Sequence, residues 1–535
     1  MNYEETANSL STEKIVSLLE VERQFSELQK QFLIIQQRLT ESEQLVFWFK
    51  TQTFGKKSER RHSDTSAPGS IQLYINQQLQ EQAELAQAQK VTEKTEVAPY
   101  QRGKAKKVQL ENAVSETGLR FGDSVPVKVI KVPNKAIEGL NPEDYEVIST
   151  KVVHRLAQTN CYLVLRYEMD VVKIKATKEV INTEAPTSVF DNSFADVSFL
   201  ARLIIDKFMY HMPLYRQEQR LIAAGIKVSR ATLVDYVMRL ALLLEPIYKS
   251  QVKSILRSLI LAMDEVPVKA GVNKEKHKMK NGYFWPMNGE ENEIAFHYAP
   301  SRSIQVLRQT LEGKFKGTLL TDGYQAYENF AAANQDIIHA LCWAHARRYF
   351  IQAENVEPVL ATKALDYIKR LYKIEEKIKG KDPLARQEAR GSYSKPIVDD
   401  FFAWLKEERG KYCLLPSSPF TKAISYCLER ESGLRVFLAN PDLPVDTNHV
   451  ERQIRPIVVG RKNWLFCFSE AGAEHAGIIF SLIATCKLHN VDPYTYLVDV
   501  LQRVQTHSSS KIEELTPRLW KQNFGQNPMR SDVDL

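Results

Sequence analysis

The chain has 535 residues, which is too long for a single hydrophobic core, so several domains are expected. Its composition, 44% hydrophobic and 26% charged, is that of an ordinary globular protein, and no apolar run is long enough to predict a membrane span. The formal net charge of +7 permits nucleic-acid binding without demonstrating it. The six cysteines are scattered, with no C-x-x-C pair, and no signal peptide is recognisable. We therefore expect a cytoplasmic protein without disulfides.

The N-terminal part of the chain predicts a coiled coil at 1–55. Apolar residues recur there at alternating three- and four-residue steps over about four heptads, with Ser42 the one polar position in the seam. The pattern favours self-association into a homo-oligomer, although a helical hairpin packed on its own domain would show it too. Residues 56–110, rich in Gln, Ala, Lys, Ser and Thr, predict a basic flexible linker, and the β-branched runs in 111–195 predict a small β-rich module.

Residues 196–252 have a helical pattern with a turn inside it. A first helix, a turn at Gly225 and a second helix capped by Ser229 fit a helix-turn-helix-like DNA-binding region. In such a motif the second helix would bring Arg230 and Thr232 to the major groove. A glycine turn and a serine cap also occur in any helical hairpin, so a purely structural interpretation stays open.

Strands and helices alternate over 253–350 and continue over 441–505. Three strands in a meander followed by βαβ units is the order of an RNase H-like α/β domain in two parts. The helical stretch 351–440 between them predicts an all-helical insertion, and 506–535 is left as a C-terminal tail. The predicted strands lie near 258–270, 282–288, 293–299, 317–321 and 336–342, with helices near 301–312 and 324–334.

Two aspartates lie where predicted strands meet their loops. Asp264 ends the apolar run SLILAMD, and Asp322 ends the run GTLLTD. A carboxylate at the end of a buried strand is costly unless a cation neutralises it. Alternation along the strand sends the neighbouring Glu265 to the opposite face. Each aspartate alone is more often a turn former or a helix cap.

A third acidic residue, Glu451, lies in NHVERQIRP, a predicted helix. The helix is opened by one of the residues 446–448 and is stopped or kinked by Pro456. Two strand-borne aspartates and a helix-borne glutamate are the set with which an RNase H-like nuclease holds two divalent ions for in-line attack on a phosphodiester. We therefore assign catalytic and metal-binding roles to Asp264, Asp322 and Glu451, with Mg²⁺ as the expected ion and Mn²⁺ as the alternative.

Cationic residues gather around the predicted glutamate helix. Cations beside a metal-binding carboxylate suit a substrate that is a chain of phosphates. An exposed ion pair at i, i+4 is the plain alternative. The aromatic residues of RKNWLFCF are mostly expected in a core strand, with one free to stack on a base. The residues expected to contact DNA here and near the metal cleft are His345, Arg347, Arg452, Arg455, Arg461, Lys462 and Trp464.

His339, Cys342 and His345 form an H-x-x-C-x-x-H string that resembles part of a zinc site. Zinc sites need three or four ligands, and no second pair lies at a suitable spacing. No zinc is expected, and we predict that His345 and Arg347 lie near the metal cleft and position DNA.

Several strings in the chain resemble the insertion-sequence-66 family of bacterial transposases. They are MDEVPV, LLTDGYQAY, CWAHARRYF, YHMPLYRQEQRLIAAGIKVSRATLVDYV, FGKKSER and the long run from VERQIRP to DPYTYL. The strings follow in order over most of the chain. By this resemblance Asp264, Asp322 and Glu451 take the places of the family's D-D-E residues, and Cys342 with His345 matches a C-x-x-H signature of several transposase groups. Many family members have a cysteine-rich segment before the helix-turn-helix region, whereas this chain has only Cys161 there.

The resemblance implies a DNA transposase that acts at the nucleoid. Such an enzyme binds the terminal inverted repeats of its insertion sequence, hydrolyses a phosphodiester to free a 3′-hydroxyl, and joins this hydroxyl to target DNA. Accessory proteins encoded by the same element are implied as possible partners. Two alternatives stay open: an RNase H-like DNA nuclease without strand transfer, and a non-catalytic DNA-binding regulator.

Overall fold

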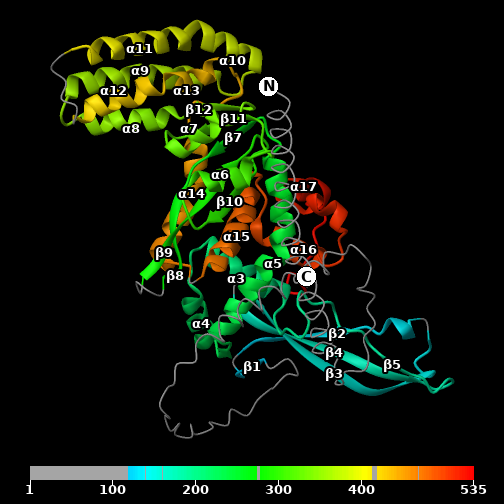
Figure 1. The fold of residues 1–535 in the computed structure, drawn as a ribbon. Coiled ribbons are helices and arrows are strands. Elements are labelled where there is room, and N and C mark those ends of the chain that lie inside the picture. The colour runs from blue at the N-terminus through cyan, green and yellow to red at the C-terminus, as the bar shows by residue number, and fades with distance from the viewer. Residues whose placement is uncertain are drawn as a thin grey trace, which may run out of the picture. The chain divides into compact units, whose positions relative to one another are not determined.

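The computed structural model describes residues 119–534, apart from 124, 139, 159–160, 274–277, 412–417 and 468. The predicted coiled coil and the basic linker lie outside these residues. The described part is a mixed α/β structure with three β-sheets (Figure 1). Within this part of the chain, no helix is both long and apolar enough to cross a lipid bilayer.

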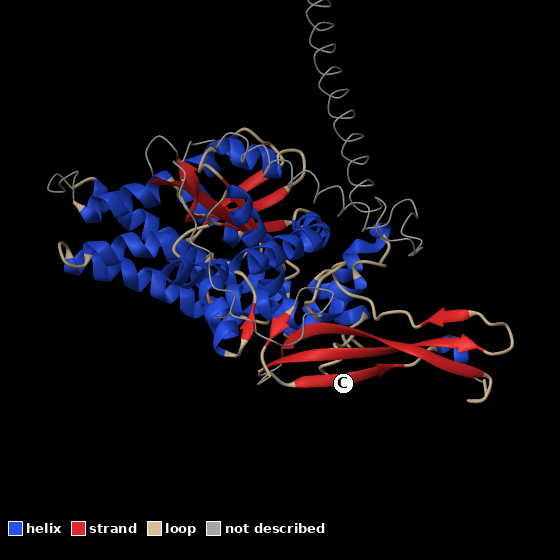
Figure 2. Ribbon diagram, turned by 90° about the horizontal axis from the view of Figure 1, so that it is seen from below, coloured by secondary structure: helices blue, strands red, loops and turns tan. Residues whose placement is uncertain are grey.

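The predicted β-rich module contains a four-stranded sheet. β4 (Tyr162–Ile174) is its central strand, antiparallel to β3 (Tyr145–Gln158) and parallel to β2 (Val127–Val132). β5 (Val180–Asn182) pairs with the end of β4. Figure 2 shows the long, twisted strands of this sheet. The alternation of β-branched residues was therefore a reliable signal for strands here.

The region predicted as a helix-turn-helix has two helices joined by a tight turn. Gly225 takes a φ of +80°, a conformation that suits glycine, and the Ser229 hydroxyl caps the second helix by accepting the Thr232 N–H at 3.1 Å. The turn also contains a short strand that pairs with the first strand of the described chain. The elements are β1 (Arg120–Phe121), α3 (Val197–Phe208), α4 (Leu214–Ala223), β6 (Ile226–Lys227) and α5 (Arg230–Ile255).

The central sheet has the strand order β10–β9–β7–β11–β12. β9 is antiparallel to both of its neighbours, β10 and β7, whereas β11 and β12 run parallel to β7. Helices follow β10 and β11, as the sequence predicts. The bounds are β7 (Ile260–Met263), β8 (Val266–Asn273), β9 (Lys278–Asn288), β10 (Ile294–Ala299), α6 (Ile304–Leu311), β11 (Gly317–Thr321), α7 (Gln325–Ala332) and β12 (Ile337–Leu341).

The strand predicted at 258–270 is divided into β7 and β8. Both pieces pair with β9 in one register, in which Met263 faces Met287 and Val266 faces Phe284. Asp264 and Glu265 form the interruption. Asp264 therefore lies directly after β7, between the two segments that pair with β9.

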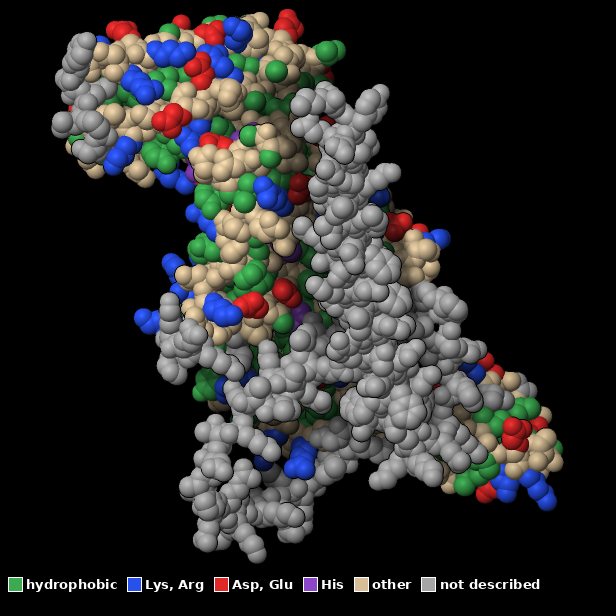
Figure 3. Space-filling view, in the orientation of Figure 1, with side chains coloured by type: hydrophobic (Ala, Val, Ile, Leu, Met, Phe, Trp, Pro, Cys, Tyr) green, Lys and Arg blue, Asp and Glu red, His purple; other side chains and the backbone are tan. Residues whose placement is uncertain are grey.

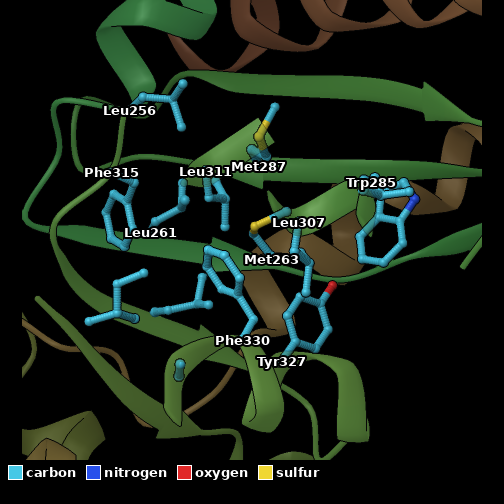
Figure 4. Packing of buried hydrophobic residues seen from close by; sticks show 14 of the residues in the cluster. Leu256, Leu261, Met263, Trp285, Met287, Leu307, Leu311, Phe315, Tyr327 and Phe330 are labelled. Carbon is cyan, nitrogen blue, oxygen red and sulfur yellow. The ribbon is translucent and has the colours of Figure 1, made fainter. Parts of the chain in front are cut away.

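A hydrophobic core fills the space between the sheet and the helices α6 and α7 (Figure 4). On the opposite side α15 (Glu470–Leu488) crosses β10 at Gly477, where a Cβ atom would lie 2.4 Å from the Phe296 carbonyl oxygen. The Ser481 hydroxyl of α15 accepts the Phe296 N–H at 2.8 Å. This contact gives one backbone N–H of the edge strand β10 a hydrogen-bond acceptor, so that this N–H is not open to pairing with another strand. The labelled core residues are Leu256, Leu261, Met263, Trp285, Met287, Leu307, Leu311, Phe315, Tyr327 and Phe330.

The sequence predicts a helical stretch at 351–440, and every regular element that the structure describes between β12 and the next long helix is a helix. Trp343, Phe350, Phe401 and Phe402 pack edge-to-face at its centre. Such clusters bury large apolar areas and hold short helices together. The elements are α8 (Trp343–Ala353), α9 (Pro358–Ile378), α10 (Pro383–Ala389), η2 (Arg390–Ser394), α11 (Lys395–Arg409), α12 (Pro419–Glu429), α13 (Glu431–Arg435) and η3 (Val436–Leu438).

The residues that follow the insertion are also mostly helical, including the segment left as a C-terminal tail. The Tyr167 hydroxyl of β4 donates a hydrogen bond to Asp532 at 2.6 Å, and the Ser531 hydroxyl donates one to Asp196 at 2.7 Å. The end of the described chain therefore packs on the β-rich module. The elements are α14 (Asn448–Trp464), α16 (Pro493–Arg503), η4 (Ser509–Leu515) and α17 (Pro517–Asn523).

Candidate active site

Asp264 and Asp322 lie side by side at the carboxyl ends of two parallel strands. Ala262 of β7 is paired in register with Leu320 of β11. Asp264 follows Ala262 by two residues, and Asp322 follows Leu320 by two residues. Carboxyl ends of neighbouring parallel strands meet at one edge of a sheet, so the register brings together two aspartates that are 58 residues apart (322 − 264).

The environment of Asp264 concentrates negative charge. Burial raises the pKa of Asp264 to about 7, and the carboxylates of Glu265, Asp322 and Glu451 act in the same direction. The Glu265 backbone N–H donates to Asp264 Oδ1 at 2.7 Å and opposes this shift. The Tyr324 N–H donates to Asp322 Oδ1 at 3.0 Å. Asp322 and Glu451 thus both act electrostatically on Asp264, a setting in which a cation binds favourably.

Glu451 reaches this edge because its helix starts at the end of β12. Thr447 is the N-cap residue of α14, and its N–H and hydroxyl both donate to the buried Cys342 thiol, at 3.2 and 3.3 Å. The Trp343 N–H donates to the Val445 carbonyl at 3.1 Å. Glu451 lies in the first turn of α14, and this helix continues through Pro456 to Trp464.

Two side chains of α8 contact the Glu451 carboxylate. Arg348 Nη2 lies 3.1 Å from Glu451 Oε1, and His345 Nε2 lies 3.8 Å from the same oxygen. Burial lowers the pKa of His345, although the charges of Asp322 and Glu451 oppose that shift. Arg347, which the sequence proposed for this place, is exposed and acts instead on the Tyr372 hydroxyl. Arg348 could have been found from its spacing, since residues i and i+3 share one helix face.

Glu265 is a second buried carboxylate that the sequence analysis set aside. Its side chain is only 3% exposed and is held by the Arg302 guanidinium and by the Tyr327 hydroxyl, which donates at 2.9 Å. Tyr327 belongs to the core between the sheet and α7, so Glu265 faces that core, as the strand alternation predicts. Arg302 in turn lies over the Tyr324 ring at 3.9 Å. Glu265 therefore already has a cationic partner.

The side chains of the H-x-x-C-x-x-H string have separate partners. His339 Nε2 lies 2.8 Å from Thr321 Oγ1, Cys342 bonds with Thr447, and His345 faces Glu451. Across the described residues, no three His, Cys, Asp or Glu side chains come close enough together to hold one metal ion.

Apart from His345 and Arg347 of α8, the proposed DNA contacts lie on α5 and α14. At the start of α5, Arg230 pairs with Glu218 at 2.9 Å, and Thr232 takes part in the Ser229 cap. On α14, Arg461 donates to the Pro267 carbonyl. The other basic candidates of this helix, Arg452, Arg455 and Lys462, are exposed.

The aromatic run after α14 was wrongly predicted as a core strand. Trp464 is the last residue of α14 and is half-buried, with its indole nitrogen beside Gly460. Phe466 is 43% exposed. The period-two spacing of aromatic residues resembles a strand, but the helix ends at Trp464 and only two residues separate it from Cys467, which forms an isolated bridge with Ala270.

Comparisons with known proteins agree with the sequence resemblance. A family model described as Transposase IS66 family matches residues 192–475, which is more than half of the chain, and a model of the IS66 C-terminal element matches residues 481–518. Two uncharacterized proteins of Sinorhizobium fredii, y4hP and y4jD, are 32% and 30% identical to this chain over 368 and 358 residues. The matches cover 64% of this chain in both cases, and 65% and 69% of the relatives.

The match to y4hP thus spans slightly less than two thirds of that relative. Among solved structures, the Drosophila P element transposase strand transfer complex overlaps 66% of this chain and 90% of that chain, at 12% identity and a TM-score of 0.21. This overlap is too low to support a shared fold. The family models decide the classification, and the chain belongs to the IS66 family of transposases.

Proposed function

We propose that the protein is a DDE-type DNA transposase with Asp264, Asp322 and Glu451 as its catalytic carboxylates. The observation that carries the proposal is the parallel register of β7 and β11, which sets two aspartates side by side at one edge of the sheet. The docking of α14 on Cys342 supports it, because this contact brings a third carboxylate to the same edge. Family membership supports the same three residues.

The arrangement of the central sheet supports an RNase H-like catalytic domain. Counting β7, β9, β10, β11 and β12 as strands one to five, their spatial order is 3-2-1-4-5, and only strand two runs antiparallel to the other four. The helical insertion enters after the fifth strand and ends before the helix that carries Glu451. Strand ends therefore supply the aspartates and a late helix supplies the glutamate, as the sequence predicts.

The carboxylates suit hard divalent cations such as Mg²⁺, or Mn²⁺ in its place, because their oxygen atoms are the preferred ligands. Burial, and after it the charges of Glu265, Asp322 and Glu451, raise the pKa of Asp264, so a bound cation would favour its ionised form. No three of the described side chains surround one point in this structure, so each of two such ions would take at most two ligands from Asp264, Asp322 and Glu451. The ions would supply activation of the attacking oxygen and stabilisation of the leaving oxygen. Arg348 and His345 would orient the phosphate beside Glu451, and the Tyr324 N–H keeps the Asp322 carboxylate in place.

The proposed substrates are the terminal inverted repeats of the insertion sequence and target DNA. Hydrolysis at an element end frees a 3′-hydroxyl, which then attacks a phosphodiester of the target at the same site. Arg230 and Thr232 would bind the repeats through α5, while the basic residues of α14 bind phosphates closer to the carboxylates. Homo-oligomerisation through residues 1–55 and help from accessory proteins of the same element belong to this proposal.

A cleavage assay tests the proposal directly. The purified chain is incubated with DNA that ends in the native terminal repeat, with Mg²⁺ or with EDTA, beside Asp322→Asn and the matched control Asp336→Asn. Asp336 is an exposed partner of Lys316 at the opposite end of β11. We expect nicking at the repeat boundary by the wild type and the control only, and only with Mg²⁺. End binding without nicking would favour the regulator, and nicking without joining of precleaved ends would favour the nuclease.

A further inference from the structure

The end of α14 has a strained backbone turn at a bulky residue. Leu465 has a φ of +63° and a ψ of −48°, and the Phe466 N–H donates across it to the Trp464 carbonyl at 2.7 Å. This is a γ-turn of the rare, positive-φ type, which a leucine side chain disfavours. A strained conformation persists only where its surroundings impose it, and such residues are concentrated at functional positions.

The surroundings that impose the strain are contacts with β8 on both sides of the turn. Before it, the Arg461 guanidinium donates to the Pro267 carbonyl. After it, the Cys467 N–H donates to the Lys269 carbonyl at 2.8 Å, and the Gly271 N–H donates to the Cys467 carbonyl at 3.3 Å. The turn is thus tied to the edge of β8 and cannot relax by moving away.

This anchored turn presents two adjacent large hydrophobic side chains to solvent. Leu465 is 65% exposed and Phe466 is 43% exposed. Neither packs in the core that the neighbouring elements form. Apolar side chains that a strained turn holds in solvent are typical of an interaction site.

A line of basic residues runs along α14 towards this turn. Arg452, Arg455 and Lys462 are exposed and, with the exposed Val459, follow steps of three, four and three residues, which places them on one helix face. In Figure 3, lysine and arginine side chains stand along the edge where Figure 1 places α14, β8 and β9. The face leads from the turn of Glu451 to Leu465, a rise of about 21 Å for 14 helical residues at ~1.5 Å each.

We propose that Leu465 and Phe466 form an apolar wedge that enters a base step of duplex DNA lying along the basic face of α14. The inference rests on the proposed function for the identity of the DNA. The basic face matches the phosphate chain in charge, and its length corresponds to about six base pairs at ~3.4 Å each. Apolar side chains that enter a base step unstack it and kink the duplex. The wedge would therefore bend DNA about six base pairs from the carboxylates.

The test measures DNA bending without cleavage. A duplex of about 30 base pairs with a fluorescent donor and acceptor at its ends is titrated with the protein in EDTA. We expect energy transfer to rise with wild type, and to stay near the free-DNA value with the double variant Leu465→Gly/Phe466→Ala. Affinity should fall about tenfold, since a buried apolar side chain is lost from the complex. Leu384→Ala, which removes an 83% exposed leucine of α10, should behave as wild type.

Thermal melting separates a DNA contact from a structural role. Glycine adopts a positive φ without strain, so Leu465→Gly alone should melt at the wild-type temperature or above it while bending is reduced. Bending by the double variant equal to wild type, no bending by wild type, or a fall in melting temperature that parallels the loss would each overturn the wedge. A change in self-association of the variants would assign the turn to a second copy instead, and would overturn it too.

The wedge and the proposed function can be refuted independently of each other. Bending is measured in EDTA and does not require the carboxylates, so a cleaving enzyme that leaves DNA straight refutes only the wedge. Conversely, Asp322→Asn should bend DNA as wild type does. Bending with no cleavage under any metal condition would refute the transposase chemistry and leave the wedge standing.

Discussion

Asp264 is the residue whose environment leads to the most specific prediction about pH and metal binding. Its pKa is raised from 3.8 to about 7, chiefly by burial and then by three neighbouring carboxylates. A carboxyl group whose pKa is raised on folding contributes most to stability at low pH, and this contribution is lost as the pH rises from about 4 through about 7. In EDTA, Asp264→Asn should therefore melt higher than wild type at pH 8, by roughly 2–8 °C, and the difference should shrink towards pH 4.

Added Mg²⁺ should reverse that order. The ion offsets the repulsion in the wild type, whose melting temperature should rise, whereas the amide variant binds the ion less well and should gain less. Thermal melting at pH 5 and pH 8, with EDTA or Mg²⁺, checks both statements. Asp336→Asn is the control, because it removes an exposed carboxylate outside the site. Equal responses of Asp264→Asn and wild type to Mg²⁺ would contradict a metal-binding role for this aspartate.

At the scale of elements, the site depends on how α14 docks on β12. Cys342→Ala would leave the buried N–H and hydroxyl of Thr447 without their acceptor, at a cost of about 1–3 kcal/mol each. We expect faster amide hydrogen exchange at 447–451 and a lower cleavage rate, with most of both recovered by Cys342→Ser, whose hydroxyl can accept. Cys427→Ala, at a buried cysteine of α12, is the matched control for lost packing. Exchange at 447–451 that responds equally to both alanine variants would reject the docking role.

Much of this architecture could be predicted from local sequence patterns, whereas the contacts between residues far apart in the sequence could not. Apolar runs predict β7, β11 and β12, and the position of Asp264 and Asp322 at strand ends follows from the same runs. The pairing of Cys342 with Thr447, 105 residues away, leaves no trace in either segment. For the same reason Arg347 was chosen over Arg348, since only the crossing of α8 and α14 decides which arginine meets Glu451.

For the molecule as a whole, the C-terminal segment joins parts of the chain that are far apart in sequence. Asp532 accepts the Tyr167 hydroxyl, and Val533 packs against the module core formed by Ala157, Leu165 and Tyr167. Removal of residues 531–535 should lower the free energy of unfolding by about 2–4 kcal/mol, because the contact of the half-buried Val533 and the hydrogen bonds of Ser531, Asp532 and Asp534 to the rest of the chain are lost. The expected result is a lower melting temperature and faster hydrogen exchange in β3 and β4, with exchange in β7 and β11 little changed.

The point variant Asp532→Asn separates the hydrogen bond from the rest of the segment. Its amide oxygen can still accept the Tyr167 hydroxyl, so it should retain most of the stability that the deletion loses. If the deletion leaves both melting and exchange in β3 and β4 unchanged, the packing of the segment contributes nothing to the module. If the expected loss is found, the β-rich module cannot be treated as an independent domain, since part of its core is supplied from the opposite end of the chain. DNA binding by the isolated module would then have to be measured with residues 531–535 present.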